Sequence, residues 1–133
     1  MRPSRRKEGS MNLLQRRREM MKGGIDIYRT IYPRDGILSD RDAFYIYLTE
    51  TLEVGTKVRL ALNFSQLDQN ATYLQIRDTY ASPPDIVINM PQMAIDVTFK
   101  ITESSTTILW CRFNPQVQTA QIDLTSIKLE KII

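Results

Sequence analysis

From residue 25 onward, hydrophobic and polar residues alternate along most of the chain with a period of two. The segments 57–64 and 93–101 show this alternation most clearly. Strict alternation over several residues is typical of a strand with one face in the core and the other in solvent. Shorter runs of the same kind predict further strands at residues 25–32, 44–49, 72–76, 86–90, 108–113, 120–124 and 127–133.

Turn-forming sequences separate these strands. Pro33-Arg34-Asp35-Gly36 is one, because proline presets φ and glycine allows a positive φ. Residues 65–70 are polar, and residues 77–85 contain a Pro-Pro pair that cannot join a strand ladder. Roughly eight or nine short strands, with no alternation of strands and helices, predict an all-β fold. We expect an antiparallel β-sandwich or barrel, with a jelly-roll-like wrap as the favoured topology.

The first 24 residues differ from the rest and form a basic N-terminal arm. Residues 1–9 contain proline, glycine, serine and basic side chains, cannot contribute to a core, and are expected to be disordered. Residues 10–22 predict a short amphipathic helix, with Ser10 as its N-cap and Gly23-Gly24 as its end. The predicted organisation is therefore an arm at 1–24 followed by a β-sandwich domain at 25–133.

Charge is distributed unevenly between the arm and the domain. Residues 1–22 contain eight basic and two acidic side chains, which gives +6. The remaining 111 residues contain ten basic and thirteen acidic side chains, which gives −3. A basic tail gains affinity for phosphate polymers by releasing their condensed counterions. The residues expected to bind nucleic acid are Arg2, Arg5, Arg6, Lys7, Arg16, Arg17, Arg18 and Lys22.

Three kinds of partner fit such an arm. Nucleic acid is the favoured one, single-stranded and bound through its backbone without sequence readout. An anionic membrane surface is the second, because Leu13, Leu14, Met20 and Met21 beside cations resemble an interfacial helix. The third alternative is a solvated tail or an import signal, since short basic runs also direct proteins to the nucleus.

Most catalytic and metal chemistry lacks the residues it needs. The chain has no histidine and one cysteine, Cys111, which excludes Ser-His-Asp and Cys-His arrangements, a zinc site and an intrachain disulfide. Cys111 lies in an alternating run and is expected to be a small buried hydrophobic residue. Asp35, Asp40 and Asp42 could hold a divalent cation, but in this turn-rich stretch we favour a role in stabilising turns. We predict a non-enzymatic protein without a cofactor.

The surface of the predicted strands contains two sets of candidate contacts. Tyr28, Tyr32, Tyr45 and Tyr47 lie opposite the aliphatic positions, with Arg29 and Arg59 near them in sequence. Aromatic residues beside cations can stack bases, but tyrosine also favours half-exposed strand faces, and we prefer the second interpretation. The other set is Ile108, Trp110 and Arg112, which share one face of a strand whose opposite face is also apolar. Tryptophan and arginine are enriched at interface anchors, so we expect an interface and a homo-oligomer.

A disordered, arginine-rich arm ahead of a compact β-sandwich resembles the layout of small viral coat proteins, and of viral matrix and movement proteins. The resemblance is one of layout and involves no sequence motif. It implies that the arm neutralises nucleic acid while the sandwich makes subunit contacts. We expect a structural or assembly protein of viral type. The alternative is a protein-interaction or membrane-peripheral matrix module that uses the amphipathic arm and a Trp110-centred surface.

The single cysteine favours a reducing compartment. The N-terminus has basic residues with no apolar run behind them, unlike a secretory signal, and the longest apolar stretch is too short to span a bilayer. We therefore expect an intracellular location, in the host cytoplasm or nucleus, or in a virion.

Overall fold

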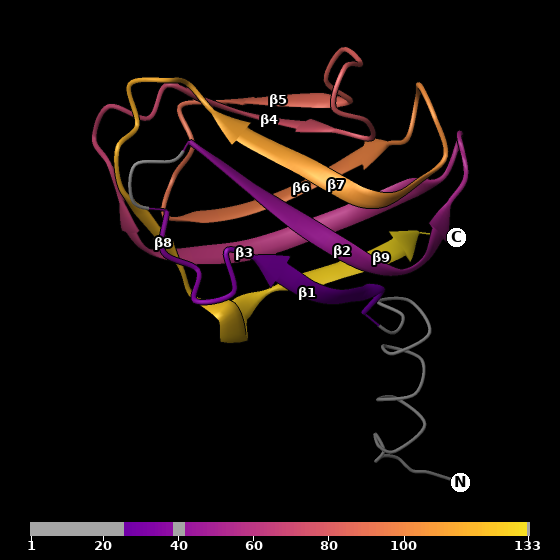
Figure 1. Cartoon of the computed structure of the whole chain (residues 1–133), viewed down its shortest axis with the longest axis horizontal. Coiled ribbons are helices and arrows are strands. Elements are labelled where there is room, and N and C mark those ends of the chain that lie inside the picture. Colours follow the sequence, from indigo (N-terminus) through magenta and orange to yellow (C-terminus); the bar gives the residue numbers. More distant parts are fainter. Residues whose placement is uncertain (1–25, 39–41, 133) are drawn as a thin grey trace, which may run out of the picture.

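The computed structural model describes residues 26–38 and 42–132, and these form an all-β structure with two antiparallel sheets (Figure 1). The sequence prediction of an all-β, antiparallel fold is confirmed. The strands are β1 (Tyr28–Tyr32), β2 (Ala43–Leu52), β3 (Lys57–Leu67), β4 (Tyr73–Arg77), β5 (Ile86–Asn89), β6 (Ala94–Lys100), β7 (Thr106–Phe113), β8 (Ala120–Ile122) and β9 (Lys128–Ile132). The arm at 1–24 with its predicted helix, and Asp40, lie outside the described residues.

The two sheets pack against each other through one hydrophobic core. The five-stranded sheet has the order β1-β2-β7-β4-β5, and the four-stranded sheet has the order β6-β3-β8, with β9 also paired to β3. Phe64 of β3 contacts Phe113 of β7, with ring centroids 5.6 Å apart. Ile27 donates its backbone N–H to Leu129 O at 2.9 Å, which joins the region before β1 to β9, and Figure 1 shows these strands on the same side of the molecule.

The strand pairing is nested. β4 pairs with β5, β3 pairs with β6, and β2 pairs with β7, so three successive strands pair in reverse order with the next three. A further pairing between β4 and β7 brings the innermost and outermost pairs side by side in the five-stranded sheet. Strands β2 to β7 therefore form one long antiparallel hairpin. Its closed end, β4 and β5, lies beside its open end, β2 and β7, in the five-stranded sheet.

The alternation seen in the sequence places the core. In β7, Leu109, Cys111 and Phe113 are fully buried, as predicted. In β3, the inward positions are Val58, Leu60, Leu62 and Phe64, all buried. Removing these apolar side chains from water is the main favourable contribution to folding.

Three details differ from the prediction. β3 continues through the polar stretch to Leu67, because its last residues pair with β8. Met93 was expected in the core but is 48% exposed, since it precedes β6. Leu124 was placed on the face of a strand, but it begins a 3-10 helix over Leu124–Ser126, which Asp123 caps by accepting a hydrogen bond from the Thr125 N–H.

Among the described residues, no helix is long and apolar enough to cross a membrane.

An arginine links three strands on the outer face of the four-stranded sheet. Arg59 of β3 donates two hydrogen bonds to Asp96 of β6, at 2.8 and 2.6 Å. Its other terminal nitrogen lies 3.7 Å from Glu130 of β9, which is only 3% exposed. These contacts hold the pKa of Arg59 above its ordinary value. Arg59 is near the tyrosines in sequence, but it belongs to the other sheet.

We expect Arg59→Gln to lower the free energy of unfolding more than Asp96→Asn does. Losing the arginine leaves the buried carboxylate of Glu130 without the cation that faces it, whereas losing Asp96 removes only an exposed partner. Urea unfolding at pH 7 measures both changes. The double variant Arg59→Gln/Glu130→Gln should recover part of the loss. Equal effects of the two single substitutions would contradict this interpretation.

Candidate functional site

Aromatic side chains form a row across the outer face of the five-stranded sheet. The strand register pairs Tyr32 of β1 with Tyr45 of β2, and Tyr45 with Trp110 of β7. Trp110 is in turn paired with Arg77 of β4. Residues directly opposite on one face of neighbouring strands have their side chains in contact range, so the row crosses four strands.

The rings of this row touch one another. Tyr32 and Tyr45 are stacked, with centroids 6.1 Å apart and planes 10° apart. Tyr45 meets Trp110 edge to face at 5.0 Å. Tyr80, from the β4–β5 loop, lies 5.7 Å from Trp110 although its own side chain is 72% exposed. We call Tyr32, Tyr45, Arg77, Tyr80, Trp110 and Arg112 the Trp110 surface.

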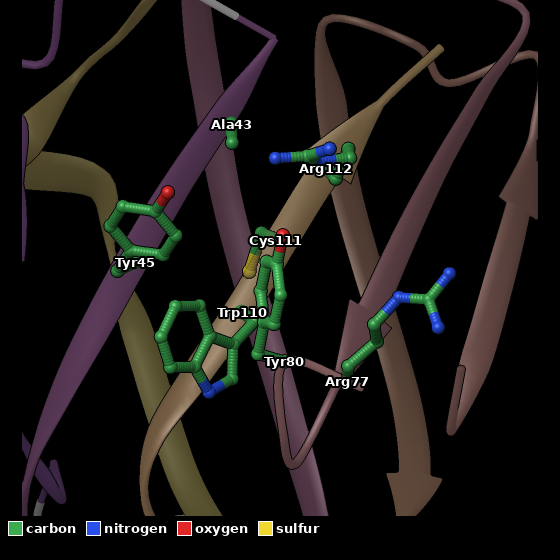
Figure 2. A pocket seen from close by; sticks show the side chains of 7 residues that line it. All are labelled: Ala43, Tyr45, Arg77, Tyr80, Trp110, Cys111 and Arg112. Atoms are coloured by element: carbon green, nitrogen blue, oxygen red, sulfur yellow. The ribbon is translucent and has the colours of Figure 1, made fainter. Parts of the chain in front are cut away.

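The Trp110 surface contains a shallow hollow of about 290 Å³, lined by Ala43, Tyr45, Arg77, Tyr80, Trp110, Cys111 and Arg112 (Figure 2). Ala43 pairs with Arg112 across β2 and β7, and its small side chain leaves space beside the rings of Tyr45 and Trp110. The volume lies just below the usual range for ligand pockets, and it suits a single flat group.

The two arginines of the hollow differ in their partners. Arg77 is held in place, because it donates one hydrogen bond to Gln75 Oε1 at 2.6 Å and another to the backbone oxygen of Ser82. In Figure 2 its guanidinium group points away from the Trp110 ring. Arg112 is exposed and has no hydrogen-bond or ion-pair partner among the described residues. The lining residues include no carboxylate, so the hollow carries positive charge.

The loop that carries Tyr80 is fixed by two aspartates at its ends. Asp78 is 1% exposed and accepts hydrogen bonds from the backbone N–H groups of Glu103 and Ser104, at 2.7 and 3.2 Å. Asp85 accepts from the backbone N–H and the hydroxyl of Thr102, at 3.0 and 2.5 Å. The loop between β4 and β5 is therefore attached to the loop between β6 and β7.

These two carboxyl groups affect each other. Burial raises the pKa of Asp85, and the neighbouring charge of Asp78 raises it further against the hydrogen bonds from Thr102. Burial also disfavours the charged form of Asp78, but the hydrogen bonds from Glu103, Ser104 and Ser82 outweigh it, so its pKa lies below the ordinary value. The pair therefore divides into an acidic Asp78 and a weakly acidic Asp85.

The structure places the sequence-predicted interface residues together. Ile108, Trp110 and Arg112 lie on the outer face of β7, where Ile108 and Trp110 are half-buried and Arg112 is exposed. Their role in an interface stays a prediction. The predicted nucleic-acid-binding residues of the arm lie outside the described residues.

The predicted tyrosines lie on strand faces that are partly open to solvent, as the preferred interpretation expected: Tyr32 is exposed, and Tyr28, Tyr45 and Tyr47 are half-buried. The sequence did not indicate that Tyr32 and Tyr45 join Trp110 in one row. Tyr28 instead packs against the core. Arg77 and Tyr80 were expected only in a loop and not at a site; Arg77 is instead the last residue of β4. No local sequence pattern indicated them, because they are brought to Trp110 by the register between β4 and β7 and by the hydrogen bonds that hold the β4–β5 loop.

Two expectations about single residues are confirmed. Cys111 is fully buried, and this burial raises the pKa of its thiol. Asp35 stabilises its turn by accepting a hydrogen bond from the Ile37 N–H at 3.1 Å, and Gly36 has a φ of +74° there.

No protein-family model matches the chain, and no curated protein matches it.

Proposed function

We propose that this chain is a non-enzymatic structural or assembly protein of viral type, comparable to coat, movement or matrix proteins, and that its basic arm binds nucleic acid without sequence specificity. The observation that carries the proposal is the separation of charge, with +6 in residues 1–22 and −3 in the rest. The net charge of the arm attracts a polyanion, so most of the body's surface stays available for contacts with other subunits.

The strand pairing supports the body's part in this proposal. Nested pairing of β2–β4 with β5–β7, folded over one core, is consistent with a jelly-roll-like β-sandwich, an architecture common in viral capsid proteins. A fold does not determine a function, so the strand pairing only supports the proposal, which rests mainly on the charge distribution. Within the proposal, the Trp110 surface is exposed and available for contacts with a nucleic acid or another subunit.

Replacing three arginines of the arm should weaken nucleic-acid binding and make it less sensitive to salt. The variant is Arg16→Gln/Arg17→Gln/Arg18→Gln in the full chain. Each phosphate contact contributes about −0.7 to the slope of log K against log salt for a single strand, so the slope should become shallower by up to about 2. Fluorescence anisotropy of a labelled single-stranded RNA at several salt concentrations measures it.

A matched control removes the same charge from the body. Lys57, Lys100 and Lys128 are exposed on the four-stranded sheet, and their replacement by glutamine should leave the salt slope near that of the wild type. An arm variant that binds RNA as tightly as the wild type would overturn the proposal. If neither the wild type nor any variant binds RNA, and the arm variant binds anionic vesicles less tightly than the wild type, the membrane-peripheral alternative is favoured instead.

A further inference from the structure

We propose that the Trp110 surface is a second nucleic-acid site, which stacks an unpaired base against Trp110 and Tyr80 and binds the adjoining phosphate with Arg112. The inference rests on the proposed function, because it assigns the bases of the same single strand to a site on the body. The arm would bind the backbone charge, and this surface would bind the flat rings.

The placement of Tyr80 supports this site. Tyr80 is 72% exposed, yet hydrogen bonds hold the loop that carries it. Asp78 and Asp85 accept from backbone N–H groups of the β6–β7 loop, and Arg77 donates to the backbone oxygen of Ser82. A loop held this firmly keeps an exposed aromatic ring 5.7 Å from the only tryptophan of the chain. Exposed aromatic rings on a rigid support are the feature by which proteins stack single-stranded bases.

The charge of the hollow suits a phosphate. Arg77 and Arg112 line it, no carboxylate does, and Arg112 has no partner among the described residues. A planar guanidinium group without a partner matches the oxygens of a phosphate, and it also stacks on aromatic rings. The same charge disfavours docking of the basic arm of a second copy, since like charges repel.

The row of rings is long enough to contact more than one base. Tyr32, Tyr45, Trp110 and Tyr80 continue from β1 across β2 and β7 to the β4–β5 loop, with successive centroids 5.0 to 6.1 Å apart. The hollow of about 290 Å³ beside Trp110 accommodates one flat ring. Tyr32, the first ring of the row, lies only eight residues after the arm in the sequence.

The single tryptophan makes the site directly observable. A short single-stranded oligonucleotide, titrated at low salt into the full chain, should change the fluorescence of Trp110. Inorganic polyphosphate should not, because it has charge but no bases. A neutral oligosaccharide also serves as a probe, since jelly rolls occur in lectins as well as capsids.

Two surface substitutions test the assigned roles while they keep Trp110 as the reporter. Tyr80→Ala should weaken the oligonucleotide about tenfold, the scale of one lost stacking contact. Arg112→Gln should weaken it and make the salt slope shallower by about 0.7. Arg29→Gln, an exposed arginine of β1 outside the hollow, is the matched control and should bind as the wild type does.

The outcomes separate this inference from the proposed function. If the oligonucleotide still quenches Trp110 in the variant Arg16→Gln/Arg17→Gln/Arg18→Gln, the site is supported independently of the arm. Binding of the strand with unchanged Trp110 fluorescence, or wild-type affinity in both Tyr80→Ala and Arg112→Gln, overturns the site and leaves the arm's role standing. Equal quenching by polyphosphate overturns the stacking role. A response to the neutral oligosaccharide alone overturns a nucleic-acid ligand altogether.

Discussion

Phe113→Ala should lower the free energy of unfolding by about 3–5 kcal/mol, the usual cost of deleting a buried aromatic side chain. Phe113 is fully buried at the end of β7 and contacts two other rings, Phe44 at 6.3 Å within its own sheet and Phe64 at 5.6 Å in the other. Its removal leaves a cavity where the two sheets meet. Urea unfolding followed by far-UV circular dichroism measures the change.

An exposed position supplies the control for this measurement. Val54 is 52% exposed in the turn between β2 and β3, and Val54→Ala should change stability by less than about 0.5 kcal/mol. A double-mutant cycle of Phe64→Leu and Phe113→Leu isolates the contact between the sheets, with an expected coupling of about 0.5–1.5 kcal/mol. A Phe113→Ala cost below about 1 kcal/mol would contradict the packing of the two sheets through this residue.

The strands of this fold were predictable because burial on one face leaves a local signal. The alternation at 57–64 identified both the strand and the side that faces the core. Strand ends were less predictable. The sequence becomes polar after Phe64, but β3 continues to Leu67 because β8, from much later in the chain, supplies hydrogen bonds there. A pattern within one segment contains no information about that partner.

The candidate site was predictable only in part for the same reason. Trp110 and Arg112 could be assigned to one face because they are two residues apart in one strand. That Tyr45 lies beside Trp110 depends on the register between β2 and β7, which is set by nonlocal packing. The position of Tyr80 depends on hydrogen bonds between two loops. The arm, by contrast, was predicted from its charge alone, and the charge of a segment can be counted directly from the sequence.

The hydrogen bonds of Asp78 and Asp85 that hold the Tyr80 loop, here called the clamp, should have the second large effect on stability. Asp78→Ala should lower the free energy of unfolding by about 2–3 kcal/mol at pH 7, because the N–H groups of Glu103 and Ser104 both lose their acceptor. The same substitution should loosen the loop and weaken any ligand that contacts Tyr80. Urea unfolding and hydrogen exchange of the loop amides measure the two effects.

The pH dependence distinguishes Asp78 from its neighbour. The pKa of Asp78 is lowered, so its contribution to stability is present above the ordinary value of 3.8 and is lost as the pH falls below it. The pKa of Asp85 is raised, so its contribution is present below 3.8 and is lost as the pH rises through the raised value. The wild type should therefore gain stability from Asp85 on mild acidification and lose stability from Asp78 at lower pH.

Asp85→Asn should separate the two contributions. The amide oxygen can still accept from Thr102, but the side chain no longer has a charge to bury beside Asp78. The variant should be more stable than the wild type at pH 7, and its advantage should shrink as the pH falls through the raised pKa of Asp85, where the wild type takes up its proton. A variant that is less stable than the wild type at pH 7 would show that the charged Asp85 stabilises the clamp, contrary to the balance of burial and hydrogen bonding described above.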